Sequence, residues 1–448
     1  MAKIFKDILT YLIRFNIITL KNNSVNGKNI QRMVCMNRIE RELYQKQLIN
    51  KQGNGLVKII TGIRRCGKSF LLDPIFKEYL ISKGVNKDHI IKIDFDERRN
   101  EKYQNPDVLD EYVRSLIVDN ETYYLLLDEV QKVDDFESVL NGFLHIYNLD
   151  IYVTGSNSKF LSSDIITEFR GRGDEIRVFP LSFAEFFSAY EGNKEEAWEE
   201  YITYGGLPKI VSFKTESEKA KYLKQLFEKT YISDIVERNK VQKIDVLDSI
   251  VNILASSIGS LTNPNKLLNT FQSNGTMDLS INTISSYMNY LQDSFLVSKA
   301  ERYDIKGKKY IQSPFKFYFS DIGLRNARLN FRQLEETHIM ENVIYNELLI
   351  RGYNVDVGVV SIREGDARKQ IEVDFVCNQF NRKYYIQSAL SLPTHEKTIQ
   401  EERPLLNIPD NFKKIIIVKD NRKHWITDNG ILVIGLLEFL LNKNSLEI

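Results

Sequence analysis

The sequence has few residues of the types that form disulfides or bind zinc. Its three cysteines, Cys35, Cys66 and Cys377, include no C-x-x-C pair and no plausible disulfide framework. Its five histidines are scattered, and none has the spacing of a zinc site. These shortages exclude a disulfide-stabilised secreted domain and a zinc protein, and they predict a protein of the reducing cytoplasm.

The sequence also lacks a long hydrophobic run and an excess of one charge. Residues 8–20 contain Arg14 and Asn16 and make a poor signal peptide, and residues 431–441 are too short to span a bilayer. We therefore expect no membrane partner. Because the 448 residues include 61 basic and 60 acidic side chains, any surface that binds nucleic acid must be local.

The most specific feature that is present is a complete phosphate-binding loop, GIRRCGKS, at residues 62–69. Its glycines let backbone N–H groups point at phosphate oxygens, its lysine reaches the β- and γ-phosphates, and its serine hydroxyl binds Mg²⁺. An apolar strand before the loop and an amphipathic helix after it give the setting that the motif requires. The alternative is a glycine-rich turn without a ligand. We predict that ATP binds through Gly62, Arg65, Cys66, Gly67, Lys68, Ser69 and Phe70, and that Ser69 also binds Mg²⁺.

Two residues near this loop carry expectations of their own. Pro74 lies two turns into the helix and should remove a hydrogen bond or kink it. Cys66 lies where a helix N-terminus can make a thiol oxidisable, and the alternative is an inert loop residue.

A second motif ends the apolar segment 123–127 with two carboxylates, Asp128 and Glu129. Continuous apolar runs are typical of strands buried on both faces of a parallel sheet. In P-loop ATPases an Asp in this position holds Mg²⁺, and the following Glu can polarise the attacking water as a general base. The alternative is a solvated strand end. The pair favours ATP hydrolysis over passive binding.

Two further polar residues and two arginines complete the predicted site. The strand 151–153 leads into Ser156 and Asn157, which could sense the γ-phosphate or position the water; the alternative is an ordinary polar loop. Arg170 and Arg172 follow, and either could act as an arginine finger, although surface arginines are common. Together with a strand at 90–95, the alternating strand and helix signals predict a doubly wound α/β parallel sheet.

The order of motifs resembles a known family. Along the chain the sequence contains GIRRCGKS, LLLDEVQKV, YVTGSNS, FRGRGDEIRVFPLSFAEF and YGGLPKIV. The series resembles prokaryotic AAA-type P-loop ATPases that carry a C-terminal domain of unknown function, from about residue 37 to the end. The resemblance implies an AAA-type core (37–195), a winged-helix domain (244–322) and a restriction-endonuclease-like α/β domain (323–448). Residues 1–36 precede the similar part and form an N-terminal extension. An amphipathic helical pattern at 219–238 predicts a helical lid or connector (196–243).

Helical and strand signals in residues 245–320 also predict three helices and a hairpin, the pattern of a winged helix. The hairpin is basic and carries aromatic residues, so it could contact phosphates of double-stranded DNA. The alternative is a packing module or a solvated hairpin. Its residues of interest are Lys299, Arg302, Tyr303, Lys306, Lys308, Lys309 and Tyr310.

The last domain resembles a nuclease whose site has degenerated. Asp374 matches the Asp that such enzymes place on one strand, but Gln387 and Ala389 stand where Glu and Lys are expected on the next. An amide is a poor Mg²⁺ ligand and Ala cannot orient a nucleophile, so nuclease activity is not expected. Glu341 and Asp374 could still bind a metal weakly, or they could belong to a buried polar network.

The sequence therefore predicts a Mg²⁺-dependent ATPase whose hydrolysis drives a conformational cycle on DNA or on a protein partner. Because finger arginines usually complete a neighbour's site, we expect a homo-oligomer in the ATP-bound state. The alternative is a slow ATP-dependent switch, a binding or adaptor module with little turnover.

Overall fold

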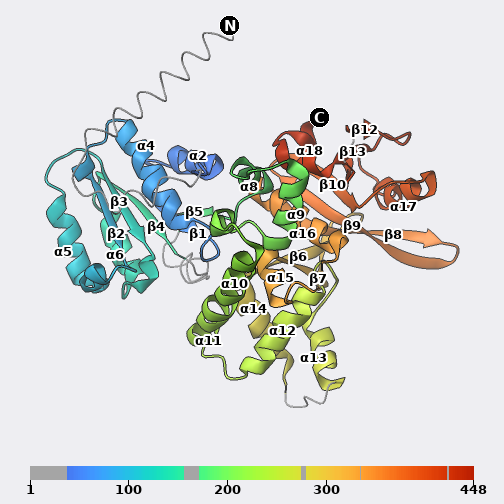
Figure 1. Cartoon of the computed structure of the whole chain (residues 1–448), viewed down its shortest axis with the longest axis horizontal. Helices are drawn as coiled ribbons and strands as arrows, with labels where there is room; N and C mark the ends of the chain where they lie inside the picture. Colours follow the sequence, from blue (N-terminus) through green and yellow to red (C-terminus); the bar gives the residue numbers. More distant parts are fainter. Residues whose placement is uncertain (1–37, 156–170, 274–278, 333, 421–422) are drawn as a thin grey trace, which may run out of the picture. The chain divides into compact units, whose positions relative to one another are not determined.

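The computed structural model describes residues 38–155, 171–273, 279–332, 334–420 and 423–448 (Figure 1). The description that follows is of the compact unit Glu40–Ile448. Among the described residues, no helix is both long and apolar enough to cross a membrane.

The first half of this unit contains a five-stranded parallel sheet with the strand order β2-β3-β4-β1-β5. This confirms the predicted α/β class and the parallel sheet. The four strands that the sequence predicts, before the phosphate-binding loop and at 90–95, 123–127 and 151–153, are all present, and β5 is a fifth. Their bounds are β1 (Val57–Thr61), β2 (Ile90–Asp94), β3 (Tyr123–Asp128), β4 (Leu149–Thr154) and β5 (Gly173–Arg177).

Helices cover both faces of this sheet. On one face, α5 (Pro106–Leu116) and α6 (Phe136–Phe143) pack through Val113 and Leu140 against Leu125 and Ile151 of the strands. On the other face, the ring of Phe76 lies 4.6 Å from the ring of Tyr152. The segment before β1 forms α2 (Glu42–Asn50). The segment that contains Phe76 forms α3 (Lys68–Phe70), the π-helical segment η1 (Leu71–Phe76) and α4 (Lys77–Ser82).

Pro74 interrupts the helix that follows the phosphate-binding loop, as predicted. Asp73 has φ −143° and ψ 115°, an extended conformation inside an otherwise helical stretch. The residue before a proline is restricted to such values because the proline ring clashes with a helical neighbour. The helix therefore consists of two pieces, and only the first follows directly from the loop.

The middle of the chain is helical. The predicted amphipathic helix at 219–238 is present, with Leu223, Leu226 and Tyr231 buried along it. Its continuity is broken by one π-helical segment. The elements are α8 (Phe183–Ser188), α9 (Lys194–Tyr204), the 3₁₀ segment η6 (Pro208–Ser212), α10 (Glu216–Leu226), η7 (Phe227–Ile232) and α11 (Ser233–Asn239).

Residues 244–319 form the three helices and the hairpin that the sequence predicts. Ser280 caps the third helix by accepting from the Thr283 N–H, as residues of its type commonly do. The elements are α12 (Ile244–Ser256), α13 (Pro264–Ser273), α14 (Ile281–Asp293), β6 (Val297–Asp304) and β7 (Lys309–Phe319).

The hairpin β6–β7 forms one edge of an eight-stranded sheet with the order β12-β13-β11-β10-β9-β8-β6-β7. Strand β6 pairs in parallel with β8, which places Arg302 opposite Val357 and Asp304 opposite Val359. The sheet is thus continuous across residue 322. Its other strands and their helices are α15 (Ile322–Arg328), α16 (Glu336–Ile350), β8 (Asn354–Glu364), β9 (Ala367–Gln379), β10 (Arg382–Ala389), α17 (His395–Leu406), β11 (Lys413–Val418), β12 (Trp425–Ile426), β13 (Leu432–Gly435) and α18 (Leu436–Leu441).

Candidate nucleotide-binding site

The phosphate-binding loop connects β1 to α3 and requires glycine at two positions. Gly62 has φ 141° and Gly67 has φ 101°, values that side-chain-bearing residues rarely adopt. A Cβ atom at Gly62 would also lie 2.1 Å from the carbonyl oxygen of Val178. The buried Lys68 ammonium donates to the carbonyl oxygens of Gly62 (2.9 Å) and Ile63 (3.2 Å). The loop is therefore closed around its lysine.

The two predicted Mg²⁺ ligands lie together at the carboxyl ends of the strands. The Ser69 hydroxyl and the Thr154 hydroxyl both donate hydrogen bonds to the Asp128 carboxylate. Burial raises the pKa of Asp128, and these two hydrogen bonds oppose that shift. A hydroxyl and a carboxylate are oxygen donors of the kind that Mg²⁺ prefers, so the residues present fit this ion.

Glu129 follows directly and has a left-handed backbone, with φ 56° and ψ 47°. Its N–H donates to the Thr154 hydroxyl oxygen (3.0 Å), and its carboxylate accepts from the Gln131 side chain. The side chain is 8% exposed. Thr154 thus contacts both acidic residues of the predicted motif. This role was not predicted from the sequence, although a hydroxyl-bearing residue at the end of β4 could have indicated it.

The tip of the loop is held by a helical segment about 170 residues further along the chain. The Tyr231 hydroxyl donates to the Arg64 carbonyl oxygen (2.6 Å), and the Arg64 guanidinium lies 2.6 Å from the Asp234 carboxylate. Pro208 also borders the loop, since a Cβ atom at Gly67 would lie 3.7 Å from its ring. Sequence reasoning missed these contacts because no local pattern indicates them.

The remaining predicted residues are distributed as follows. Cys66 is fully buried, and its thiol donates to the Val178 carbonyl oxygen, which supports the interpretation as an inert residue. Arg65 and Phe70 are exposed. Arg172 is exposed at the opposite end of the sheet, where its carbonyl oxygen accepts from the Val57 N–H. Ser156, Asn157 and Arg170 lie outside the described residues.

The predicted nuclease-like position in the C-terminal sheet contains a buried lysine. The Lys316 ammonium lies 2.9 Å from the Glu341 carboxylate and 2.6 Å from the Glu372 carboxylate. The Tyr318 hydroxyl donates to Glu341 as well (2.6 Å). Asp374 accepts from the backbone N–H (2.8 Å) and the hydroxyl of Ser388 (3.0 Å).

This arrangement favours the buried polar network that the sequence left as one alternative. Burial raises the pKa of Asp374 to about 7, with the Glu341 charge acting in the same direction. The carboxylates of Glu341 and Glu372 raise the pKa of Lys316 despite its burial. Over the part of the chain that the structure describes, no group of three or more His, Cys, Asp or Glu side chains is placed to hold a metal ion.

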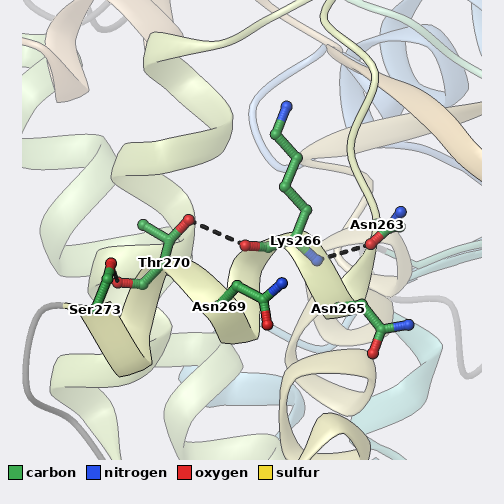
Figure 2. A pocket seen from close by; sticks show the side chains of 6 residues that line it. All are labelled: Asn263, Asn265, Lys266, Asn269, Thr270 and Ser273. Atoms are coloured by element: carbon green, nitrogen blue, oxygen red, sulfur yellow. Dashed lines mark hydrogen bonds between the residues drawn. The ribbon is translucent and has the colours of Figure 1, made fainter.

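A polar cavity of about 490 Å³ lies on α13, and no residue of the two clusters lines it (Figure 2). Its polar groups bond mostly within the helix: Asn263 accepts from the Lys266 N–H (2.7 Å), and Thr270 donates to the Lys266 carbonyl oxygen (3.0 Å). The cavity is lined by Asn263, Asn265, Lys266, Asn269, Thr270 and Ser273, which include no acid or nucleophile pair for catalysis.

Comparisons with known proteins agree with the loop geometry. A family model described as an AAA domain matches residues 54–187, and a model described as a domain of unknown function (DUF8612) matches residues 195–335. An uncharacterized protein of Haemophilus influenzae is 33% identical over 409 residues, which cover 90% of this chain and 98% of that protein. An uncharacterized protein of Methanocaldococcus jannaschii is 27% identical over 419 residues, covering 87% and 89%.

Two solved structures show a weaker likeness. The Aeropyrum pernix ORC1 protein, solved in complex with DNA, is 12% identical, with 65% of this chain and 92% of that chain covered and a TM-score of 0.27. A DNA polymerase III gamma subunit-related protein of Thermotoga maritima is 11% identical, with 57% and 98% covered and a TM-score of 0.27. Scores at this level do not establish a shared fold over the whole chain, so the sequence matches carry the family assignment.

Proposed function

Because the chain belongs to the family of the Haemophilus influenzae protein, and because its residues 54–187 match the model of an AAA domain, we propose that it is a Mg²⁺-dependent ATPase. The observation that carries the proposal is the cluster of Ser69, Asp128, Thr154 and Glu129 at the strand ends beside the Lys68 loop. Nucleotide binding and water activation require these residue types in this arrangement.

Each residue has a separate task in this proposal. Lys68 leaves its two carbonyl partners for the β- and γ-phosphates, while the loop N–H groups bind the remaining phosphate oxygens. Ser69 and Asp128 would hold Mg²⁺, which neutralises charge on the phosphates when bound. Thr154 orients the Asp128 carboxylate and fixes the Glu129 backbone, so that the Glu129 carboxylate can accept a proton from the attacking water.

We expect Lys68→Ala to weaken ATP binding by about 30-fold or more, because losing a buried charged contact costs about 2–5 kcal/mol. Isothermal titration calorimetry with ATP and Mg²⁺ on the full chain measures the effect. Lys83→Ala, an exposed lysine beyond α4, is the matched control and should bind as the wild type does. ATP affinity that is equal in Lys68→Ala and wild type would contradict the assignment of the loop.

The contacts at the tip of the loop support a conformational cycle. A change of the loop on binding or losing the γ-phosphate would move the Arg64 carbonyl and guanidinium, which are tied to Tyr231 and Asp234. Those two residues lie on the helical segment that leads to α12. We propose that residues 196–243 act as the lid or connector, and that it passes the nucleotide state to the C-terminal half.

We also propose that Arg172 completes the site of a neighbouring copy. The β1–β5 register places Arg172 about six residues from the loop along the strands, or ~20 Å, too far for its own site. An ATP-dependent increase of at least about twofold in mass by light scattering is expected on a Glu129→Gln background. Mixing Arg172→Ala with Glu129→Gln should restore turnover that each lacks alone, since each supplies what the other has lost. A chain that stays monomeric with ATP, and mixtures without recovered turnover, would rule out a finger in trans.

For the C-terminal half we propose a winged-helix-like region (244–322) and a restriction-endonuclease-like region (323–448) that bind DNA or a protein partner without cleaving it. Gln387, Ala389 and the Lys316 ammonium between two carboxylates support the absence of cleavage. The alternative function, a slow ATP-dependent switch with little turnover, uses the same contacts at the loop tip.

A further inference from the structure

Two β-hairpins are neighbours in the C-terminal sheet, and the second extends beyond the first: β6 ends opposite Val359, and β8 continues to Glu364. The turn at 305–308 joins β6 to β7, and the turn at 365–366 joins β8 to β9, the long orange hairpin in Figure 1. The Ile305 N–H donates to the Val359 carbonyl oxygen (3.0 Å), and the Lys306 ammonium donates to the Ser361 carbonyl oxygen (2.9 Å). These bonds tie the first turn to strand β8.

The two hairpin ends carry a local excess of positive charge. In a chain with nearly equal basic and acidic residues, residues 302–310 and 361–371 together have seven basic and three acidic side chains. All of the basic ones except Arg302 are exposed. The basic residues are Arg302, Lys306, Lys308, Lys309, Arg363, Arg368 and Lys369, and the acidic ones are Asp304, Glu364 and Asp366.

Two of these positive charges repel each other and destabilise the hairpin when no ligand is bound. Arg363 and Arg368 lie directly opposite each other in the β8–β9 register. Like charges in this position destabilise a strand pair. Glu364 is shared between Lys369 (3.3 Å) and Arg403, so its negative charge is divided between two other cations. A bound polyanion would relieve the repulsion between the two arginines.

The chemistry of the exposed side chains indicates the kind of partner. The apolar residues of both hairpin ends point inward, with Ile305 4%, Val360 0% and Ile362 8% exposed. An apolar protein interface or a bilayer would require exposed apolar side chains here. Exposed cations beside a half-exposed Tyr310 instead match the phosphates and sugars of a nucleic-acid backbone.

We propose that the ends of these two hairpins form one surface, the two-hairpin surface, which binds the phosphodiester backbone of a nucleic-acid duplex. This inference rests on the proposed DNA partner and deepens it. It adds the β8–β9 hairpin, which sequence reasoning did not include, and it assigns the contact to the backbone rather than to base edges.

The test uses two double variants of the full chain. One carries Lys308→Gln with Lys309→Gln, and the other carries Arg363→Gln with Arg368→Gln. Fluorescence anisotropy measures binding to DNA duplexes of different sequence and to an RNA duplex over a range of salt concentrations. Each pair should weaken binding about tenfold or more at low salt, equally for all sequences, and should lower the salt slope by about 2, because each lost phosphate contact removes about 0.9. Lys83→Gln with Lys87→Gln, two exposed lysines in the AAA part, is the control.

This experiment can contradict the two-hairpin surface without contradicting the ATPase proposal. Binding to both duplexes, or to DNA alone, supports the surface and says which backbone it accepts. No binding of wild type at low salt, or binding that the Arg363 and Arg368 pair leaves unchanged, overturns it. ATP affinity measured in the same samples shows whether the variants are folded. A wild type that binds ATP but no duplex would contradict the two-hairpin surface and leave the ATPase proposal in place.

Discussion

Glu129→Gln is expected to bind ATP as tightly as the wild type and to lose about 10²- to 10⁴-fold of its ATP turnover. The amide keeps the size of the side chain and can still accept from Gln131, but it cannot take a proton from water. The phosphate contacts of Lys68 and the loop do not involve this carboxylate, so affinity should remain. Phosphate release under saturating ATP and Mg²⁺ measures the rate, and calorimetry measures the affinity.

Glu121→Gln is the matched control for this experiment. Glu121 is exposed and precedes the same strand, β3, at the end remote from the loop. It should leave both the rate and the affinity unchanged. Equal turnover of Glu129→Gln and wild type would remove Glu129 as the general base. If the wild type binds ATP tightly but releases phosphate no faster than a reaction without protein, the slow-switch alternative is favoured.

The parts of the fold that the sequence predicted are those encoded by contiguous residues. The loop at 62–69, the apolar strand before Asp128 and the break before Pro74 each depend on residues within a few positions of one another. Local signals of this kind predicted a parallel sheet and four of its strands, whereas the fifth, β5, was not predicted.

The parts that the sequence did not predict depend on residues far apart in the chain. Tyr231 and Arg64 are separated by 167 positions, and the ion pair of Arg64 with Asp234 is similarly distant. The pairing of β6 with β8 places the predicted wing in a larger sheet, because its exposed edge could hydrogen-bond to another strand. Neither contact leaves a periodic or compositional signal.

The C-terminal cluster shows how a single distant residue changes the interpretation of a site. Glu341, Glu372 and Asp374 suggest a cation site by their residue types alone, and the cation beside them comes from the chain itself as Lys316, on β7. A buried ammonium paired with carboxylates is costly to unpair, because each remaining charge is left without compensation in a medium of low polarity.

Lys316→Met is therefore expected to destabilise the chain by about 3–5 kcal/mol near pH 8, the cost of breaking a buried ion pair. The loss should be smaller near pH 5.5. Asp374 keeps its proton in the folded protein up to about pH 7, whereas the unfolded chain releases it near its ordinary value of 3.8. Without the ammonium, which lowers the pKa of Asp374, that pKa should rise further, so Asp374 stays neutral at pH 5.5 and does not add to the unpaired negative charge.

Denaturant-induced unfolding followed by circular dichroism at the two pH values measures this difference. Lys309→Met, an exposed lysine on the same strand, should change stability by no more than about 0.5 kcal/mol at either pH. Adding Glu341→Gln to Lys316→Met should recover part of the loss, because the amide removes one unpaired charge and still accepts from the Tyr318 hydroxyl. A loss that is the same at both pH values, and additive with Glu341→Gln, would show that Lys316 acts through packing and not as the counter-ion of the cluster.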